Sequence, residues 1–457
     1  MRRTDAQGAV ATRTLARTFG VRDIVLIVIG TVIGSGIFIV PATVLRETGA
    51  DPTLSMSIWL VAGVLSLLGA LTYGELSAMQ PEAGGIYVYL RDAFGPWLAF
   101  LYGWTLFLVI GSGSVATLSA AFTGYLAQLV PLTPVASRMA ALLMIIVVAT
   151  INVRGTRGSA AVNAGATSLK MAALVVMSAA LVMAGGAANE STVTGPAPTE
   201  AAALSGWALM AGAGAAMIGV LWAYEGWQYA TFSAGETLRP QRTFPLGIGL
   251  GTAALILLYC FANYAYIAAL GPDEAALSTS IAATAVGATF GAAAGKLVAV
   301  AILVSIFSAS NAVLLTAPRV FYAMARDGLF FRRLAEVHPR FGTPATAIIA
   351  TAAWAAVLAG SGTFDTLLRF VITTGWIFYA LGAASIFIYR RRQPDAPRPF
   401  RVPGYPVTPL LFVVAAFAIV VNALFTNTFT TAMGIAFVLL GAPVYLFWKR
   451  RAEAPLR

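Results

Sequence analysis

The stretch Ile29-Gly30-Thr31-Val32-Ile33-Gly34-Ser35-Gly36-Ile37-Phe38 interrupts the first long apolar segment of this chain. Glycine destabilises a helix interior by about 1 kcal/mol relative to alanine, so the Gly34-Ser35-Gly36 triplet favours local unwinding of the backbone. Inside a bilayer, unpaired N–H and C=O groups are tolerated only beside protein or a water-filled cavity. The stretch therefore predicts a broken membrane helix with a ligand site at the break. Close helix packing through Gly30 and Gly34 is the alternative interpretation.

The composition around this stretch is that of a membrane protein. Hydrophobic residues make up 59% of the 457 residues, charged residues make up only 10%, and the mean hydropathy is +0.82. Soluble domains carry about 25% charged residues, so this chain has too few charges to cover a water-facing surface. The single cysteine, Cys260, and the single histidine exclude an intrachain disulfide and a Cys/His metal cluster, and no metal or cofactor is expected.

Apolar runs long enough to cross a bilayer, about 20 residues each, recur along the chain. They predict an all-α polytopic membrane protein with twelve transmembrane helices. The expected spans, of which the first and the sixth are broken, are 22–47, 54–79, 96–130, 136–153, 159–185, 208–237, 245–269, 292–325, 343–360, 364–390, 406–427 and 429–448. The run 273–290 begins with two acidic residues and is expected to form an external helical loop.

The positive charges predict the orientation. Of the 29 Lys and Arg residues, all but five fall in segments that share one side of the membrane if the N-terminus is cytoplasmic. Only Arg46 and Arg138 lie in loops on the other side, and Lys170, Lys296 and Arg369 lie within spans. This bias predicts a multi-pass protein of the cytoplasmic membrane with both termini in the cytoplasm. It also accounts for the net charge of +11 without a nucleic-acid partner.

A second interruption lies in the sixth span, in Gly219-Val220-Leu221-Trp222-Ala223-Tyr224-Glu225-Gly226-Trp227-Gln228. A glutamate at the bilayer centre costs about 2.5–3.5 kcal/mol, so Glu225 is expected to face protein or water. Broken helices at matching positions of two five-helix halves indicate an inverted-repeat transporter. The expected organisation is a tail at 1–21, a first repeat at 22–185, a second repeat at 208–391, two further helices within 406–448, and a tail at 449–457.

Four stretches give the chain a family resemblance. They are Gly34-Ser35-Gly36-Ile37-Phe38, the segment from Tyr73-Gly74-Glu75-Leu76 through Pro81-Glu82-Ala83-Gly84-Gly85-Ile86-Tyr87 to Phe94-Gly95, the segment from Trp222-Ala223-Tyr224-Glu225-Gly226-Trp227 to Arg242-Thr243-Phe244-Pro245, and Arg398-Pro399-Phe400-Arg401-Val402-Pro403-Gly404-Tyr405-Pro406. In this order the chain resembles an amino acid permease of the amino acid–polyamine–organocation (APC) superfamily, in its L-amino-acid-transporter-like branch. The resemblance implies a LeuT-type fold with helices 1 and 6 discontinuous and secondary transport of amino acids by alternating access.

The resemblance also implies how the substrate is held. Its carboxylate would meet backbone N–H groups of Ser35, Gly36 and Ile37, which agrees with the positive end of a half-helix dipole. Its ammonium would meet carbonyls near Thr31, Val32 and Ile33 and, on helix six, near Trp222, Ala223 and Glu225. Trp222 matches the family's aromatic gate, and Tyr224 and Trp227 are further gate candidates. For Trp222 the alternative is an ordinary core or lipid-interface aromatic.

Lys170 is the second informative residue. It lies about eleven residues into the fifth span, which argues against its reaching the membrane interface. An ammonium there is unfavourable unless carbonyls pair with it or it loses its proton. The resembled family places a lysine at this position, where sodium-coupled relatives bind an ion. Ser305 and Ser308 are expected to complete this ion- or proton-coupling site.

Glu225 departs from the commonest pattern of the family, which has glycine there. Its carboxylate would pair with a cationic substrate, bind a water, or hold Trp227 or Gln228. We expect a neutral L-amino acid, moved by exchange or proton symport. A transporter of arginine, lysine or polyamines is the alternative, and a non-transporting sensor is a remote one.

Other function classes are disfavoured. The sequence has no repeated filter or charged ring of a channel and no clustered catalytic residues of an enzyme. The loop 131–137 lacks the cysteine that tethers the heavy chain of animal relatives, so we expect no disulfide-linked partner and a monomer or weak homo-oligomer. Glu75, Gly84 and Gly85 are assigned to a loop that shapes the cytoplasmic gate. Glu236 is expected to pair with Arg239 or Arg242, at the gate or in solvent.

Overall fold

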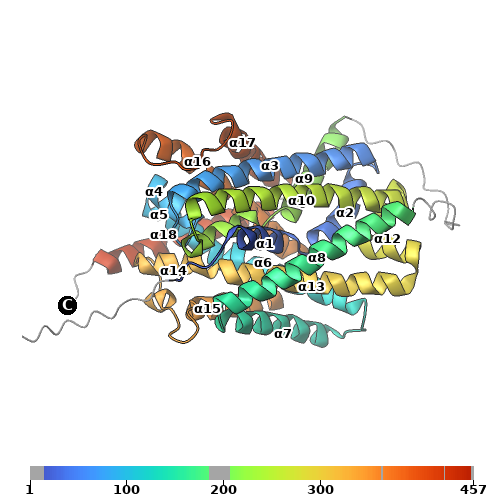
Figure 1. Ribbon diagram of the computed structural model, residues 1–457, viewed down its shortest axis with the longest axis horizontal. Helices are drawn as coiled ribbons and strands as arrows, with labels where there is room; N and C mark the ends of the chain where they lie inside the picture. The colour runs from blue at the N-terminus through green and yellow to red at the C-terminus, as the bar shows by residue number, and fades with distance from the viewer. Residues whose placement is uncertain (1–14, 185–205, 362–363, 427, 454–457) are drawn as a thin grey trace, which may run out of the picture.

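The structure, a computed structural model, describes residues 15–184, 206–361, 364–426 and 428–453, and it is almost entirely helical over them (Figure 1). No β-strand occurs in these residues, although one isolated bridge pairs Phe19 with Thr237. In chain order the helices are α1 Val21–Val32, α2 Gly36–Glu47, α3 Pro52–Met79, α4 Ile86–Phe94, α5 Pro96–Thr105, the π-helix η1 Leu106–Ile110, α6 Gly111–Ala127, α7 Pro134–Val153, α8 Thr156–Ala184, α9 Trp207–Ala223, the 3₁₀-helix η2 Trp227–Glu236, α10 Pro240–Leu270, α11 Pro272–Leu277, α12 Ile281–Phe290, α13 Ala292–Thr316, α14 Pro318–Arg326, the 3₁₀-helix η3 Arg332–Ala335, α15 Ala345–Ser361, α16 Phe364–Arg392, α17 Val407–Thr426 and α18 Thr428–Glu453.

Each of the twelve expected spans contains helix. Within the described residues, nine helices are long and apolar enough to cross a membrane, and the bent pair of α1 and α2 makes a tenth. The expected ninth span is α15, a shorter apolar helix, and the expected tenth, α16, is not among these ten either, so the count of twelve crossings stays a prediction. The run 273–290 forms the short helices α11 and α12, as a helical loop requires. Residues 1–14 of the first expected tail and 454–457 of the second lie outside the described residues.

Local sequence signals set the helix starts. The Asp51 side chain accepts hydrogen bonds from the N–H groups of Thr53 and Leu54 and caps α3, which begins at a proline. The Thr133 hydroxyl caps α7 in the same way, again before a proline. Proline fits the first helical position because its missing N–H has no intrahelical partner there.

The helices form one elongated bundle (Figure 1). The short helix α14 and the arginine-rich C-terminal part of α18 lie at one end, and α12 lies at the other. Inside the bundle, α1 packs against α8, α10 and α13, and α2 packs against α9. The two broken segments are therefore neighbours at the centre.

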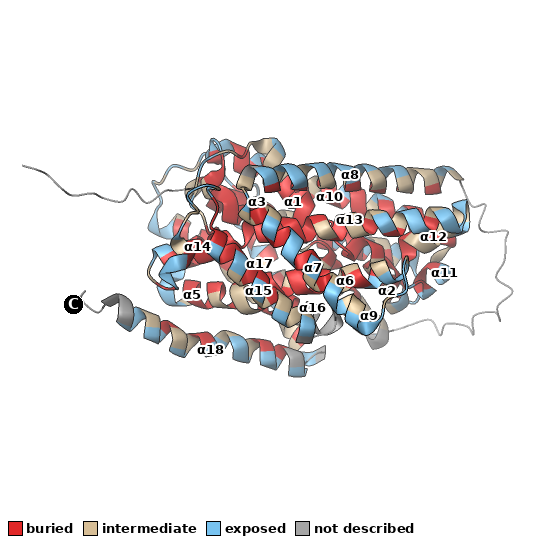
Figure 2. Ribbon diagram, turned by 90° about the horizontal axis from the view of Figure 1, so that it is seen from below, coloured by how far each residue is buried: buried red, intermediate tan, exposed pale blue. Residues whose placement is uncertain are grey.

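The outer helices expose apolar side chains. On α7, Leu143 and Ile146 are 62% and 60% exposed, and Leu439 on α18 is 57% exposed. Figure 2 shows long exposed faces on α8 and α18 around a buried interior. Exposed apolar faces of this extent fit a surrounding of lipid.

Candidate functional site

The backbone between α1 and α2 leaves the helical path at residues 33–35, and the two half-helices are bent by 49°. Because α2 starts at Gly36, its first N–H groups have no preceding helical turn to supply acceptors. Among the described residues, no acceptor pairs with the N–H groups of Ser35, Gly36 or Ile37. The Ser35 hydroxyl is fully buried and has no partner in the described ranges either. This helix end therefore presents free donors and a positive dipole.

Lys170 on α8 reaches the other side of the break. Its Nζ donates to the Gly30 carbonyl at 2.8 Å and to the Ile33 carbonyl at 2.6 Å, and the residue is 3% exposed. Gly30 allows α8 this close, because a Cβ there would lie 2.7 Å from side-chain oxygens of Asn163 and Thr167. A lysine this deep in a span needs carbonyl partners, and Lys170 has two of them at the end of the first half-helix.

Two further side chains bind carbonyls at the end of α1. Ser305 Oγ donates to the Ile33 carbonyl at 3.0 Å, and the Tyr259 hydroxyl donates to the Val32 carbonyl at 3.2 Å. Among the described residues, no donor pairs with the Thr31 carbonyl. Of the three carbonyls predicted to meet an ammonium, those of Val32 and Ile33 are already in use. Ser308, the other predicted member, is buried and has no hydrogen-bond partner in the described structure.

The second break meets the first through glycine. α9 ends at Ala223, and Gly226 follows with a φ of 133°, which favours glycine. The Thr31 hydroxyl donates to the Gly226 carbonyl at 3.0 Å. A Cβ at Gly226 would lie 2.8 Å from the Thr31 carbonyl carbon, and one at Gly36 would lie 2.8 Å from the Ala223 Cα. The two interrupted backbones are therefore in direct contact.

A cavity of about 40 Å³ lies at this junction. By the size that one water needs, it holds a few waters at most, so the site is contracted. Its lining includes most of the predicted binding residues, namely Thr31, Val32, Ser35, Gly36, Trp222, Ala223 and Glu225. The side chains of Ile33 and Ile37 do not line it.

Other helices complete the cavity with Ser114, Thr117 and Leu118 of α6, Tyr229 of η2, Val313 of α13 and Val371 of α16, of which the sequence points only to Ser114. Ser114 belongs to a Gly/Ser-rich stretch of α6 that is a weak sequence signal for a pocket wall. The others carry no such signal, because a lone apolar or hydroxyl residue in a span looks the same whether it faces a cavity or a helix. Only the packing of distant helices identifies them.

Glu225 projects into the same junction. Its Oε1 accepts from the Tyr379 hydroxyl at 2.6 Å and from Gln228 Nε2 at 3.2 Å, while Oε2 is buried and has no partner in the part of the chain that the structure describes. Of the alternatives for Glu225, the contact with Gln228 is present in this structure. Tyr379 of α16 was not predicted, and it ties the break in helix six to a helix more than 150 residues away in sequence.

The three predicted gate residues lie in different surroundings. Trp222 borders the cavity, whereas Tyr224 and Trp227 do not. Tyr224 is 1% exposed and packs 5.0 Å from the ring of Tyr259, and Trp227 packs 5.4 Å from the ring of Tyr73. The rings of Tyr224 and Trp227 thus pack in the core and do not border the cavity in this structure, and a gating role for them stays a prediction.

A buried ion pair closes the arginine-rich end. Glu236 at the end of η2 accepts from Arg319 Nε of α14 at 2.8 Å, and both side chains are at most 2% exposed. The expected partners Arg239 and Arg242 are not paired with it, so that prediction is wrong. Sequence proximity favoured them, but Arg239, which precedes α10, and Arg242 in its first turn are both exposed.

Glu75 is also placed differently from the expectation. It lies inside α3, fully buried, and not in the following loop. Arg390 of α16 pairs with it at 2.7 Å, and the Val402 N–H donates to it at 2.6 Å. Gly84 and Gly85 do lie in the turn before α4, both with positive φ. Glu75 therefore joins three separated segments.

Comparison with known proteins agrees with this architecture. A family model described as amino acid permease matches residues 19–445. The serine/threonine exchanger SteT of Bacillus subtilis is 31% identical over 440 residues, covering 96% of this chain and 98% of that protein. The human cystine/glutamate transporter is 31% identical, covering 93% and 85%, and the mouse b(0,+)-type amino acid transporter 1 is 28% identical, covering 97% and 92%.

Proposed function

This chain belongs to the amino acid permease family, and we propose that it exchanges small neutral L-amino acids across the cytoplasmic membrane by alternating access. Membership of the family makes it a multi-pass membrane transporter of amino acids and not an enzyme. The substrate, the coupling mode and the roles of individual residues are the proposal.

The observation that carries the proposal is the meeting of two broken helices at one cavity. The unpaired N–H groups of Ser35, Gly36 and Ile37 are suited to a carboxylate. The Thr31 carbonyl and the Ala223 carbonyl at the end of α9, for which the described residues provide no donor, are suited to an ammonium. A zwitterion would satisfy both sets of backbone groups at once, and this would leave the side chain of the substrate to decide selectivity.

Size and polarity of the cavity favour a small neutral substrate. The cavity is about 40 Å³, and the hydroxyl-bearing residues Ser114, Thr117 and Tyr229 line it. Hydroxyl groups can pair with a serine or threonine side chain, whereas a large apolar side chain would need the walls to separate. Trp222 would move to admit the substrate, as a gate.

The carbonyl contacts of the Lys170 ammonium support exchange. Its two carbonyl hydrogen bonds hold the end of α1 in the way a bound cation would, so the cycle needs no added cation to form the site. Each transition between the two sides would then be driven by a bound amino acid. Proton symport is the alternative coupling, in which Lys170 releases its proton during the cycle.

The test uses purified protein in proteoliposomes loaded with unlabelled serine. We expect labelled serine or alanine to enter only when the lumen contains an amino acid, at similar rates at pH 6 and pH 8. Uptake into empty vesicles that follows an imposed proton gradient would refute exchange in favour of symport. Saturable binding without any movement of label would refute transport and support a sensor.

A cationic substrate is the second candidate, because the buried Oε2 of Glu225 has no partner within the described structure. Uptake of alanine, leucine and arginine by wild type and Glu225→Gln separates the two. We expect arginine to be a poor substrate of both proteins. Arginine uptake by wild type that Glu225→Gln abolishes would overturn the neutral assignment.

The orientation and the assembly complete the proposal. Both termini would lie in the cytoplasm, in keeping with the arginines that end α14, α16 and α18 at one end of the bundle. No disulfide-linked subunit is proposed, because Cys260 is the single cysteine of the chain and lies within α10. Labelling of single cysteines introduced near Arg391 and in the loop 271–280 would test this orientation.

A further inference from the structure

We propose that a groove between α7 and α15, on the outer surface of the helix bundle, binds one anionic glycerophospholipid from the bilayer. The groove encloses about 460 Å³, within the range of small-molecule sites, and it is separate from the cavity at the broken helices.

The groove forms because the facing side chains of the two helices differ in size. On α7, Ile145, Ile146 and Val153 form one wall, and the facing positions of α15 are Ile349, Ala352, Ala353 and Ala356. Short alanine side chains opposite branched ones leave a channel between the two helices. The channel opens toward the surroundings, since Ile146 is 60% and Ile349 is 56% exposed. An acyl chain is the apolar ligand that a bilayer supplies at such a position.

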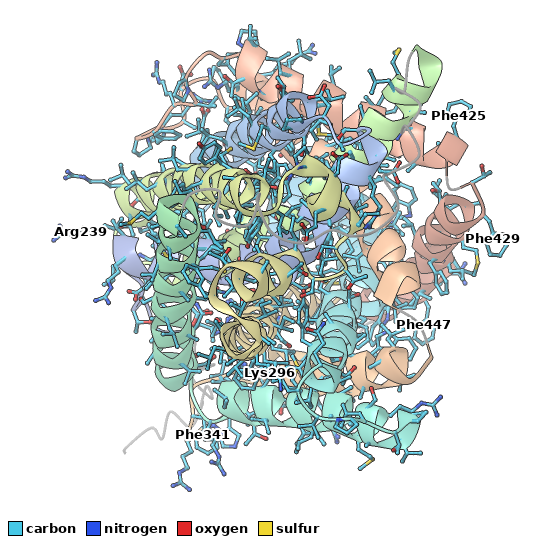
Figure 3. The ribbon with its side chains drawn as sticks, turned by 90° about the vertical axis from the view of Figure 1, so that its right-hand side faces the viewer. Arg239, Lys296, Phe341, Phe425, Phe429 and Phe447 are labelled. Carbon is cyan, nitrogen blue, oxygen red and sulfur yellow. The ribbon has the colours of Figure 1, made fainter. Side chains whose placement is uncertain are left out.

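One end of the groove is cationic and aromatic. Arg154, which follows α7, and Phe341 both line it. The Arg340 guanidinium lies 5.5 Å from the centre of the Phe341 ring, and Figure 3 shows Phe341 at the outer margin of the molecule. Arg154 and Arg340 are exposed, and neither forms an ion pair with a described carboxylate.

The positive charge at the end of the groove favours an anionic lipid as its ligand. Two unpaired arginines at the edge of an apolar groove match a phosphate-bearing headgroup above its acyl chain, and basic pockets between membrane helices recognise such headgroups. If a second copy of this chain occupied the groove instead, it would have to place a carboxylate from an apolar helix beside the two arginines. The exposed side chains of α7 that lie nearest, such as Leu143, are apolar.

The groove is connected to the substrate site through α15. On its other face, Trp354 Nε1 donates to the Leu108 carbonyl at 2.9 Å, and the Thr351 carbonyl accepts from Ser112 of α6 at 3.3 Å. Ser114 and Thr117 of the same helix α6 line the cavity. A lipid that fixes α15 would therefore hold one wall of that cavity.

The test titrates purified full-length protein with dioleoyl phosphatidylglycerol or dioleoyl phosphatidylcholine and counts bound lipids by native mass spectrometry. We expect one phosphatidylglycerol to bind at least tenfold more tightly than phosphatidylcholine. A basic side chain near an anionic surface contributes about a fivefold factor, so Arg154→Gln/Arg340→Gln should weaken that binding by about 25-fold. Ala353→Phe and Ala356→Phe, which fill the groove, should each abolish it.

The matched control is Arg391→Gln, an exposed arginine at the end of α16 that does not border the groove. Equal binding of the two lipids by wild type would overturn the proposal, as would undiminished phosphatidylglycerol binding by the double arginine variant. Dimers that Ala353→Phe dissociates would overturn it in favour of a second copy. Binding is measured without transport, so this result stands independently of the substrate assignment.

Discussion

Replacing Lys170 by methionine tests the role of the fixed ammonium most directly. Methionine keeps most of the side-chain length and removes the charge. The Ile33 carbonyl would keep its bond from Ser305, whereas the Gly30 carbonyl would lose its donor. Hydrogen bonds to a charged group contribute about 1.5–3 kcal/mol each. Losing the bond that nothing replaces should therefore weaken the assembled site by about 10- to 150-fold.

The assay is serine counterflow in proteoliposomes together with serine binding to purified protein. Ser305→Ala removes one neutral hydrogen bond, for which about 0.5–1.5 kcal/mol and a two- to twelvefold loss are expected. Lys170→Met should therefore reduce serine binding and counterflow more than Ser305→Ala does. Lys296→Met is the control, because Lys296 lies on α13 and is exposed.

A Lys170→Met protein that folds and exchanges serine at the wild-type rate would refute the reasoning. Equal losses in Lys170→Met and Lys296→Met would do the same, since they would reflect a general effect of removing a lysine.

Three further predictions concern the contacts around the site. Gly226→Ala should lower both thermal stability and exchange, because its Cβ would overlap the Thr31 backbone. Gly124→Ala is the control and should melt as wild type does, because the space around Gly124 is open. Equal melting temperatures of the two variants would contradict this. Arg319→Gln should destabilise the protein by about 3–5 kcal/mol, since it leaves Glu236 buried and unpaired. Adding Glu236→Gln should restore part of the lost stability in a thermal melt. A further decrease in the melting temperature of the double variant would count against the buried pair. Glu225→Gln should keep serine exchange within a few-fold of wild type, because an amide can still accept from the Tyr379 hydroxyl, and complete loss in the uptake assay would show that the charge itself is needed.

The sequence alone was sufficient for the class and for the places where the chain breaks. Composition and the length of the apolar runs lead to a helical membrane protein, because lipid leaves the backbone few other ways to satisfy its hydrogen bonds. Glycine at residues 34, 36 and 226 marks both interruptions, because the low helix propensity of glycine and its freedom at positive φ are local properties. A buried lysine needs partners wherever it lies, so Lys170 was recognisable without knowing what it touches.

Tertiary structure alone decided the partners. Arg319 pairs with Glu236, Arg390 with Glu75 and Tyr379 with Glu225, each across many residues of sequence. The rotation of Tyr224 and Trp227 into the core, and the presence of Thr117 and Val371 in the cavity wall, follow likewise from how distant helices dock. Helix propensity and hydrophobicity depend on neighbours along the chain, whereas the facing of a side chain depends on which helices surround it, and in a bundle of apolar helices many arrangements satisfy the same local pattern.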